Sequence, residues 1–286
     1  MSETHTGQQP SALAEKEAAE PVPQQEVPMR RWSFFVYGVF CHLLFLATYA
    51  CMAVFVGNLW APKSLDSAPA NSLFAVGVDV LLIALFGLQH SIMARPWFKR
   101  IWTRLVPQPI KRSTYVVISC VAVFLLMWQW RALDAIIWNV QHPVGRGLLW
   151  ALFAAGWLMV PAVSLMINHF DLFGTRQVWL YLRGRPYVSL PFRTPLLYNR
   201  MRHPLYVGWA VAFWATPTMT LGHLLFAGGM TLYVVVAARF EERDLVDHYG
   251  DTYRAYQRRV PAYVPRFGKG DEPAAVLPAT SATERA

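Results

Sequence analysis

The stretch Arg200-Met-Arg-His-Pro-Leu-Tyr-Val-Gly-Trp209, followed by Arg239-Phe-Glu-Glu-Arg-Asp-Leu245, decides the fold. The 35 residues from 204 to 238 contain no Lys, Arg, Asp or Glu. As one helix they would extend about 50 Å, whereas the hydrocarbon core of a membrane is only about 30 Å thick. The segment is therefore predicted to cross a membrane twice and to turn near residues 217–222, with both charged ends close together on the same side.

The composition places the rest of the chain in a membrane as well. Hydrophobic residues make up 55% of the 286 positions and charged residues only 15%, with a mean hydropathy of +0.28, which excludes an ordinary soluble domain. We expect an all-α integral membrane protein with about six transmembrane helices, a C-terminal helical hairpin and a cytoplasmic amphipathic lid helix. The predicted spans are 34–57, 72–94, 114–130, 148–167, 204–219 and 222–238.

The distribution of basic residues predicts the orientation. Segments 95–112 and 169–203 each hold six Lys or Arg residues, whereas loops 58–71 and 131–147 together hold three. Basic loops stay on the cytoplasmic side, so we expect a multi-pass cell membrane protein with both termini cytoplasmic. The formal charge of +9 is then explained by topology, and no nucleic-acid partner is expected.

The two ends of the chain differ from the membrane part. Residues 1–29 are polar and lack the apolar run of a signal peptide, so we predict a disordered cytoplasmic tail there and a second one at 268–286, around a membrane domain at 30–267. Cys41, Cys51 and Cys120 lie in apolar spans without the spacing of a metal site, and we interpret them as packing residues.

The start of the first hairpin helix has an unusual charge. Pro204 suits the first turn of a helix and places His203 at the cap, beside Arg202. A helix N-terminus already carries about half a positive charge, so further cations there favour a bound anion. The alternative is that Arg202 and His203 only mark the cytoplasmic interface.

The other end of the hairpin supplies carboxylates and a further helix. Glu241 and Glu242 lie about 100° apart on a helix, so one of them is expected to face a given pocket. An amphipathic stripe follows at steps of four, four, three and four residues and ends at Pro261. Its members are Leu245, Tyr249, Tyr253, Tyr256 and Val260. This helix could cover the bundle as a lid or lie on the membrane surface.

These features suit a zwitterionic cofactor such as S-adenosyl-L-methionine. An anion site could hold its carboxylate, a Glu could accept from its ribose hydroxyls, and aromatic faces favour its sulfonium. The motifs Arg202-His-Pro-Leu-Tyr-Val-Gly-Trp209, Glu241-Glu, Tyr253-x-x-Tyr256 and Val260-Pro-x-x-x-Pro265 resemble the C-terminal half of the isoprenylcysteine carboxyl methyltransferase superfamily. Its members are integral membrane enzymes that bind this cofactor.

Two further motifs narrow the resemblance. Gln89-His-Ser-Ile-Met-Ala-Arg-Pro96 and Asn168-His-Phe-Asp-Leu-Phe-Gly-Thr-Arg-Gln-Val-Trp179 are similar to the bacterial methanethiol S-methyltransferase family, over about residues 31–266. The resemblance implies methylation of methanethiol, a small volatile thiol, to dimethyl sulfide. Prenylcysteine enzymes carry an Arg farther upstream, where this chain has Ala237, so Arg239 is considered as its substitute. The candidate cofactor-binding residues are Arg202, His203, Tyr206, Gly208, Arg239, Glu241 and Glu242.

Methyl transfer from a sulfonium is an in-line displacement, so the protein must hold the thiol sulfur near the methyl carbon and help to form the thiolate. His90 follows Asp79 by close to three helical turns on one face of the second span, about 16 Å away. His169 and Asp171 lie where the fourth span meets the cytoplasm. We take His90, His169 and Asp171 as candidate catalytic residues; a His that caps a helix or binds a carbonyl is the structural alternative.

Other functions remain open from the sequence. The methyl acceptor could be another thiol, a prenylcysteine carboxylate or a lipid. In a different class, His42, His90 and His169 could bind haem, or the chain could be a transporter, although matched broken spans are not apparent. Otherwise His42 is expected to be a packed polar residue. The lipid bilayer is the expected surrounding, and no metal and no protein partner are predicted.

Overall fold

The computed structural model describes residues 28–60, 62–70, 72–190 and 194–266. The predicted tails lie outside these residues, except that residues 28 and 29 begin the first helix. Within the described residues, five helices are long and apolar enough to cross a membrane, which confirms the all-α integral membrane fold. These are α1 (Pro28–Val56), α2 (Leu73–Ala94), α4 (Lys111–Gln129), α5 (Pro143–Ile167) and α9 (Leu221–Tyr249), with the shorter α8 (Pro204–Trp214) beside them.

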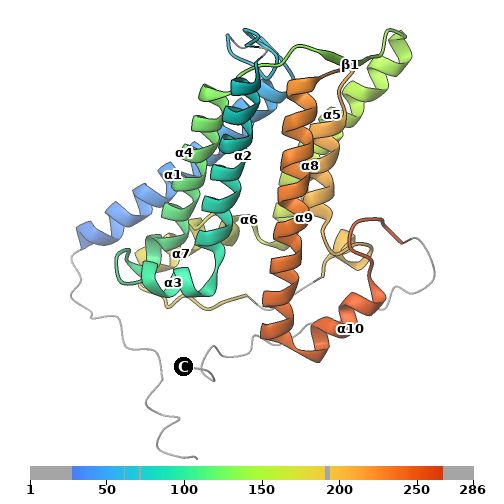
Figure 1. Ribbon diagram of the computed structural model, residues 1–286. Coiled ribbons are helices and arrows are strands. Elements are labelled where there is room, and N and C mark those ends of the chain that lie inside the picture. Colours follow the sequence, from blue (N-terminus) through green and yellow to red (C-terminus); the bar gives the residue numbers. More distant parts are fainter. Residues whose placement is uncertain (1–27, 61, 71, 191–193, 267–286) are drawn as a thin grey trace, which may run out of the picture.

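The long helices form two groups that stand side by side (Figure 1). One group holds α1, α2 and α4, and the other holds α5, α8 and α9. Short elements lie at one end of the long helices: α3 (Pro96–Trp102), η1 (Gln108–Ile110), α6 (His169–Leu172), α7 (Thr175–Leu182), η2 (Leu196–Asn199) and α10 (Asp251–Arg259). At the opposite end β1 (Ile136–Asn139) pairs antiparallel with β2 (Thr218–Thr220), a small sheet that the sequence did not predict.

The outer faces of the long helices are apolar. On α1, Val36, Phe40 and Leu43 are each more than half exposed, whereas Cys41 is fully buried. Exposed large hydrophobic side chains at helical spacing are unfavourable in water but suit contact with lipid. The buried core therefore lies between the two helix groups, where Trp157, Phe213 and other aromatic residues pack.

Helix α8 is much shorter than the predicted span 204–219. Its 11 residues extend about 16 Å, roughly half of a hydrocarbon core. The chain continues as a buried, extended segment whose backbone groups pair with the region around β1. Val140 N–H donates to Pro217 O at 2.9 Å and Leu221 N–H donates to Ala135 O at 2.7 Å. These hydrogen bonds satisfy polar groups of the extended backbone inside the protein, as a membrane protein requires.

The C-terminal amphipathic stripe forms, but it does so on two helices. α9 runs through the charged residues to Tyr249, and Gly250 then adopts φ 57° and ψ −133°, which breaks the helix before α10. Glycine alone adopts this backbone conformation readily. Tyr253, Tyr256 and Val260 are buried in a cluster with residues of the last turn of α9. The prediction that one continuous helix carries the stripe was therefore wrong, whereas the prediction that its residues form one apolar face is confirmed.

Candidate active site

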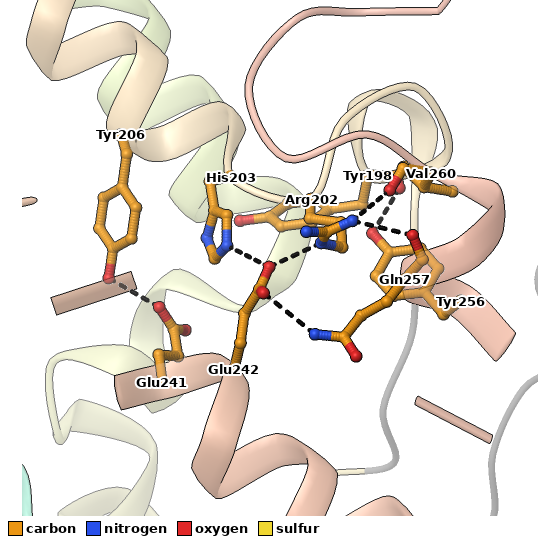
Figure 2. A network of polar contacts seen from close by, with 9 residues as sticks. All are labelled: Tyr198, Arg202, His203, Tyr206, Glu241, Glu242, Tyr256, Gln257 and Val260. Carbon is orange, nitrogen blue, oxygen red and sulfur yellow. Dashed lines mark hydrogen bonds and ion pairs between the residues drawn. The ribbon is translucent and has the colours of Figure 1, made fainter. Parts of the chain in front are cut away.

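The two charged motifs of the hairpin meet at the carboxylate of Glu242, on α9. Glu242 Oε1 accepts a hydrogen bond from Arg202 Nε at 2.6 Å and lies 2.8 Å from His203 Nε2, while its Oε2 accepts from Gln257 Nε2 at 3.0 Å. Figure 2 shows these three side chains converging on Glu242 from the start of α8 and from α10. The predicted proximity of the two hairpin ends is thus confirmed.

The same contacts attach the C-terminal segment to α8. Arg202 Nη1 donates to Val260 O at 2.5 Å and to Gln257 O at 3.0 Å. The backbone N–H groups of Arg202 and His203 donate to Pro261 O and Ala262 O. His203 is the residue before α8 and Pro204 occupies its first turn, as the sequence predicts. The anion beside these cations is therefore the protein's own Glu242, and the arrangement fixes α10 across the end of the hairpin.

Glu241 points in a different direction. Its Oε2 accepts a hydrogen bond from Tyr206 OH at 2.7 Å, on the side of the helix away from Arg202 (Figure 2). The His203 ring stacks on Tyr206, with centroids 5.2 Å apart, and lies 5.6 Å from Tyr263. Glu242 thus has three side-chain partners that fix its position, whereas Glu241 is exposed and accepts a hydrogen bond from the Tyr206 phenol.

Neutral phenols surround the two carboxylates. Burial raises the pKa of Tyr198, and the negative charge of Glu241 raises it further. Burial likewise raises the pKa of Tyr263, with Glu242 adding to the effect. These side chains therefore remain protonated at physiological pH and offer O–H donors and aromatic faces without adding negative charge.

His90 lies on α2 and contacts residues of α4 and α9. Its ring is 5.0 Å from the Tyr115 ring and 6.3 Å from the Tyr233 ring, and Tyr233 in turn interacts electrostatically with Glu241. His90 Nδ1 lies 3.1 Å from Ser119 Oγ, which donates its single proton to Tyr115 O. We therefore assign the ring proton to Nδ1 and the lone pair to Nε2, which makes no hydrogen bond to the described residues.

His169 belongs to a separate chain of hydrogen bonds. Its Nδ1 lies 2.8 Å from Ser164 Oγ and its Nε2 lies 3.3 Å from His42 Nε2, while His42 Nδ1 lies 3.1 Å from Thr175 Oγ1. Burial lowers the pKa of His169, which is therefore neutral. This chain joins α1, α5, α6 and α7, so His42 takes part in a network rather than only packing in the first span.

The remaining candidate residues have other surroundings. Asp171 forms an ion pair with Arg176 at 2.8 Å and accepts from Tyr187 OH at 3.2 Å. Arg239 is exposed. Gly208 is buried where α8 crosses α5, and a Cβ there would lie 3.2 Å from Val160 Cγ2, so close helix packing accounts for the glycine.

Sequence reasoning did not identify several residues of the site. Gln257 reaches Glu242 from the polar face of α10, where nothing distinguishes it from its charged neighbours. Tyr198 accepts from Tyr256 OH through its backbone carbonyl at 2.6 Å, just before the quoted motif. Tyr233 lies in the middle of an apolar span, where a polar phenol group was the only feature of the sequence that could have indicated a role in the site.

The fold and the site define a multi-pass helical membrane protein whose C-terminal helix pair holds a carboxylate site at one end of the bundle. A family model described as NnrU protein matches residues 79–274. The chain is 49% identical over 235 residues to the methanethiol S-methyltransferase of Crocosphaera subtropica, covering 82% of this chain and 92% of that protein. It is 50% identical over 238 residues to the enzyme of the same name from Mycobacterium tuberculosis, covering 83% and 98%.

A more distant relative is the Nurim homolog of Drosophila pseudoobscura pseudoobscura, 29% identical over 224 residues, which cover 75% of this chain and 86% of that protein. No solved structure matches. The chain therefore belongs to the NnrU protein family and, within it, to the methanethiol S-methyltransferase family of membrane methyltransferases.

Proposed function

We propose that the protein methylates methanethiol to dimethyl sulfide with S-adenosyl-L-methionine as the methyl donor. Its relatives named methanethiol S-methyltransferase support the reaction. One observation supports the location of the active site. Residues at the start of α8 and on α10 bind the adjacent carboxylates Glu241 and Glu242 of α9. We further propose that this end of the bundle faces the cytoplasm, where such a donor is available, with both termini on that side.

The residues at this place fit the chemistry of the cofactor. When bound, S-adenosyl-L-methionine supplies an electrophilic methyl group on a positively charged sulfonium. Glu241 offers a carboxylate to ribose hydroxyls or to positive charge, and Tyr206 holds it through their hydrogen bond. The ring of Tyr263, 5.6 Å from that of His203, offers an aromatic face to a cation. Arg202 and Glu242 hold α10 in place beside these residues.

The thiol is proposed to lie between His90 and the Glu241–Tyr206 pair. The His90 ring on α2 lies 6.3 Å from the Tyr233 ring on α9, the helix that also carries Glu241. His90 Nε2 would accept the thiol proton and later release it to water, while Glu241 and Tyr206 would hold the cofactor, which would supply the methyl group to the thiol sulfur. His169, with both ring nitrogens engaged, is proposed to position α6 and α7 instead.

Two measurements test this function. Membranes that contain the protein, supplied with methanethiol and S-adenosyl-L-methionine, should release dimethyl sulfide into the headspace, as gas chromatography can record. Calorimetry on the purified protein should show cofactor binding that Glu241→Gln and His203→Ala weaken. If the protein binds the cofactor but releases no dimethyl sulfide, the methyl acceptor must be another compound. If it does not bind the cofactor, the proposed function is refuted.

A further inference from the structure

A second feature lies at the same end of the bundle but outside the proposed active site. It is a cavity of about 1160 Å³, lined by the start of α1, the end of α2, α3, the start of α4 and α7 with the residues after it. None of the residues that bind Glu241 or Glu242 lines it. Tyr115 lines the cavity and also contacts His90, so the two regions adjoin.

The cavity is strongly basic. Its described lining residues include no Asp or Glu and five cationic side chains: Arg30, Lys99, Lys111, Arg112 and Arg185. Lys111 Nζ donates to Thr103 Oγ1 at 2.8 Å and Arg112 Nε donates to Leu172 O at 2.7 Å, so neutral oxygens orient these cations without cancelling their charge. Desolvation, Arg112 and other neighbouring cations lower the pKa of Lys99, although Asp244 opposes them. An anion in the cavity would relieve this excess of positive charge.

Two buried polar atoms of the lining have no hydrogen-bond partner among the described residues. One is the indole Nε1 of Trp102, which can only donate, and the other is the side-chain oxygen of Gln177, which can only accept. Gln177 uses its Nε2 on Asp171. A buried group without a partner is costly, so the pair favours a ligand that brings both acceptor oxygens and a hydroxyl or amine donor.

We propose that this cavity binds a phosphodiester anion that carries hydroxyl groups, supplied as the head group of an anionic phospholipid such as phosphatidylglycerol. The phosphate oxygens would pair with the cations and the Trp102 indole, and a head-group hydroxyl would donate to Gln177. The cavity lies at the cytoplasmic ends of membrane helices, where basic pockets meet lipid head groups. The sulfonium cofactor carries a net positive charge and is disfavoured among five cations.

The test uses the full chain in nanodiscs or detergent and two matched charge variants. Native mass spectrometry and thermal unfolding would compare phosphatidylglycerol with phosphatidylcholine of the same acyl chains. Glycerol 1-phosphate serves as the soluble probe. The double variant K99Q/K111Q removes two lining cations. The control R100Q/R104Q removes two exposed cations that do not line the cavity.

Phosphatidylglycerol should bind in preference to phosphatidylcholine, and K99Q/K111Q should weaken that binding by about tenfold to thirtyfold, while the control stays near the wild type. Competition by glycerol 1-phosphate would support the same chemistry with a soluble source. Equal binding of both lipids, or an equal loss in both variants, would overturn the proposal. So would a loss of cofactor affinity in K99Q/K111Q, because the cavity would then belong to the cofactor; the proposed methyl transfer itself would remain.

Discussion

Replacement of Glu242 by Ala should release α10 from the end of the hairpin. Glu242 is the common acceptor for Arg202, His203 and Gln257, which come from two elements far apart in the sequence. Without it the guanidinium of Arg202, whose side chain is 13% exposed, loses its only carboxylate partner among the described residues. The connection between α8 and α10 would then depend on Arg202 donating to two carbonyls and on backbone hydrogen bonds.

The size of the effect follows from these contacts. Removing one partner of a buried ion pair costs about 3–5 kcal/mol, and each hydrogen bond to a charged group contributes about 1.5–3 kcal/mol. Because Glu242 is 19% exposed and Arg202 keeps its carbonyl acceptors, we take the lower value, about 3 kcal/mol. The population in which α10 is detached should therefore increase about a hundredfold.

Hydrogen exchange of residues 251–259, measured by mass spectrometry on the protein in nanodiscs, reports this opening. Glu241→Ala is a matched control, because it removes the same charge from the adjacent position of the same helix, where the carboxylate accepts a hydrogen bond from Tyr206 and does not bind Arg202 or Gln257. We expect α10 to lose protection in Glu242→Ala and to keep it in Glu241→Ala. Equal protection in the two variants would refute the assignment of Glu242 as the residue that fixes α10.

Three further predictions concern single residues. His90→Gln should lower the rate of dimethyl sulfide formation by about a hundredfold with little change in cofactor affinity, as expected for loss of a general base; an unchanged rate in headspace chromatography would exclude that role. Burial holds the pKa of His169 below 6.5 in the folded protein, so the unfolded chain binds a proton that the folded one does not, and stability should fall as pH drops below about 6.5. His169→Gln should reduce this acid sensitivity in thermal unfolding, and an unaltered pH profile would count against it. Gly250→Ala should destabilise the bend before α10 by about 1–2 kcal/mol, from backbone strain alone because no described residue lies within 4 Å of an added Cβ. An unfolding temperature equal to that of the wild type in calorimetry would contradict this.

The parts of the fold that the sequence predicted are those set by one-dimensional patterns. Apolar length and the positions of charge are sufficient to identify membrane helices, and they located the hairpin ends at Arg202 and Glu242. The short α8 could not be found in this way. Residues 215–220 carry no charge, so the absence of charge does not show that the helix ends before them, and their extended form depends on pairing with β1, about 80 residues earlier in the chain.

The sequence predicted that the two charged ends of the hairpin meet, but not which charged side chains pair there, and the reason is electrostatic. Cations at a helix start indicate that an anion is close, but charge alone does not distinguish a ligand from a side chain of the same protein. In the structure Glu242 satisfies Arg202 and His203, which leaves Glu241 as the carboxylate available to a ligand. Two adjacent glutamates at 100° on one helix therefore have different tasks, one fixing α10 and the other facing the proposed methyl-transfer site.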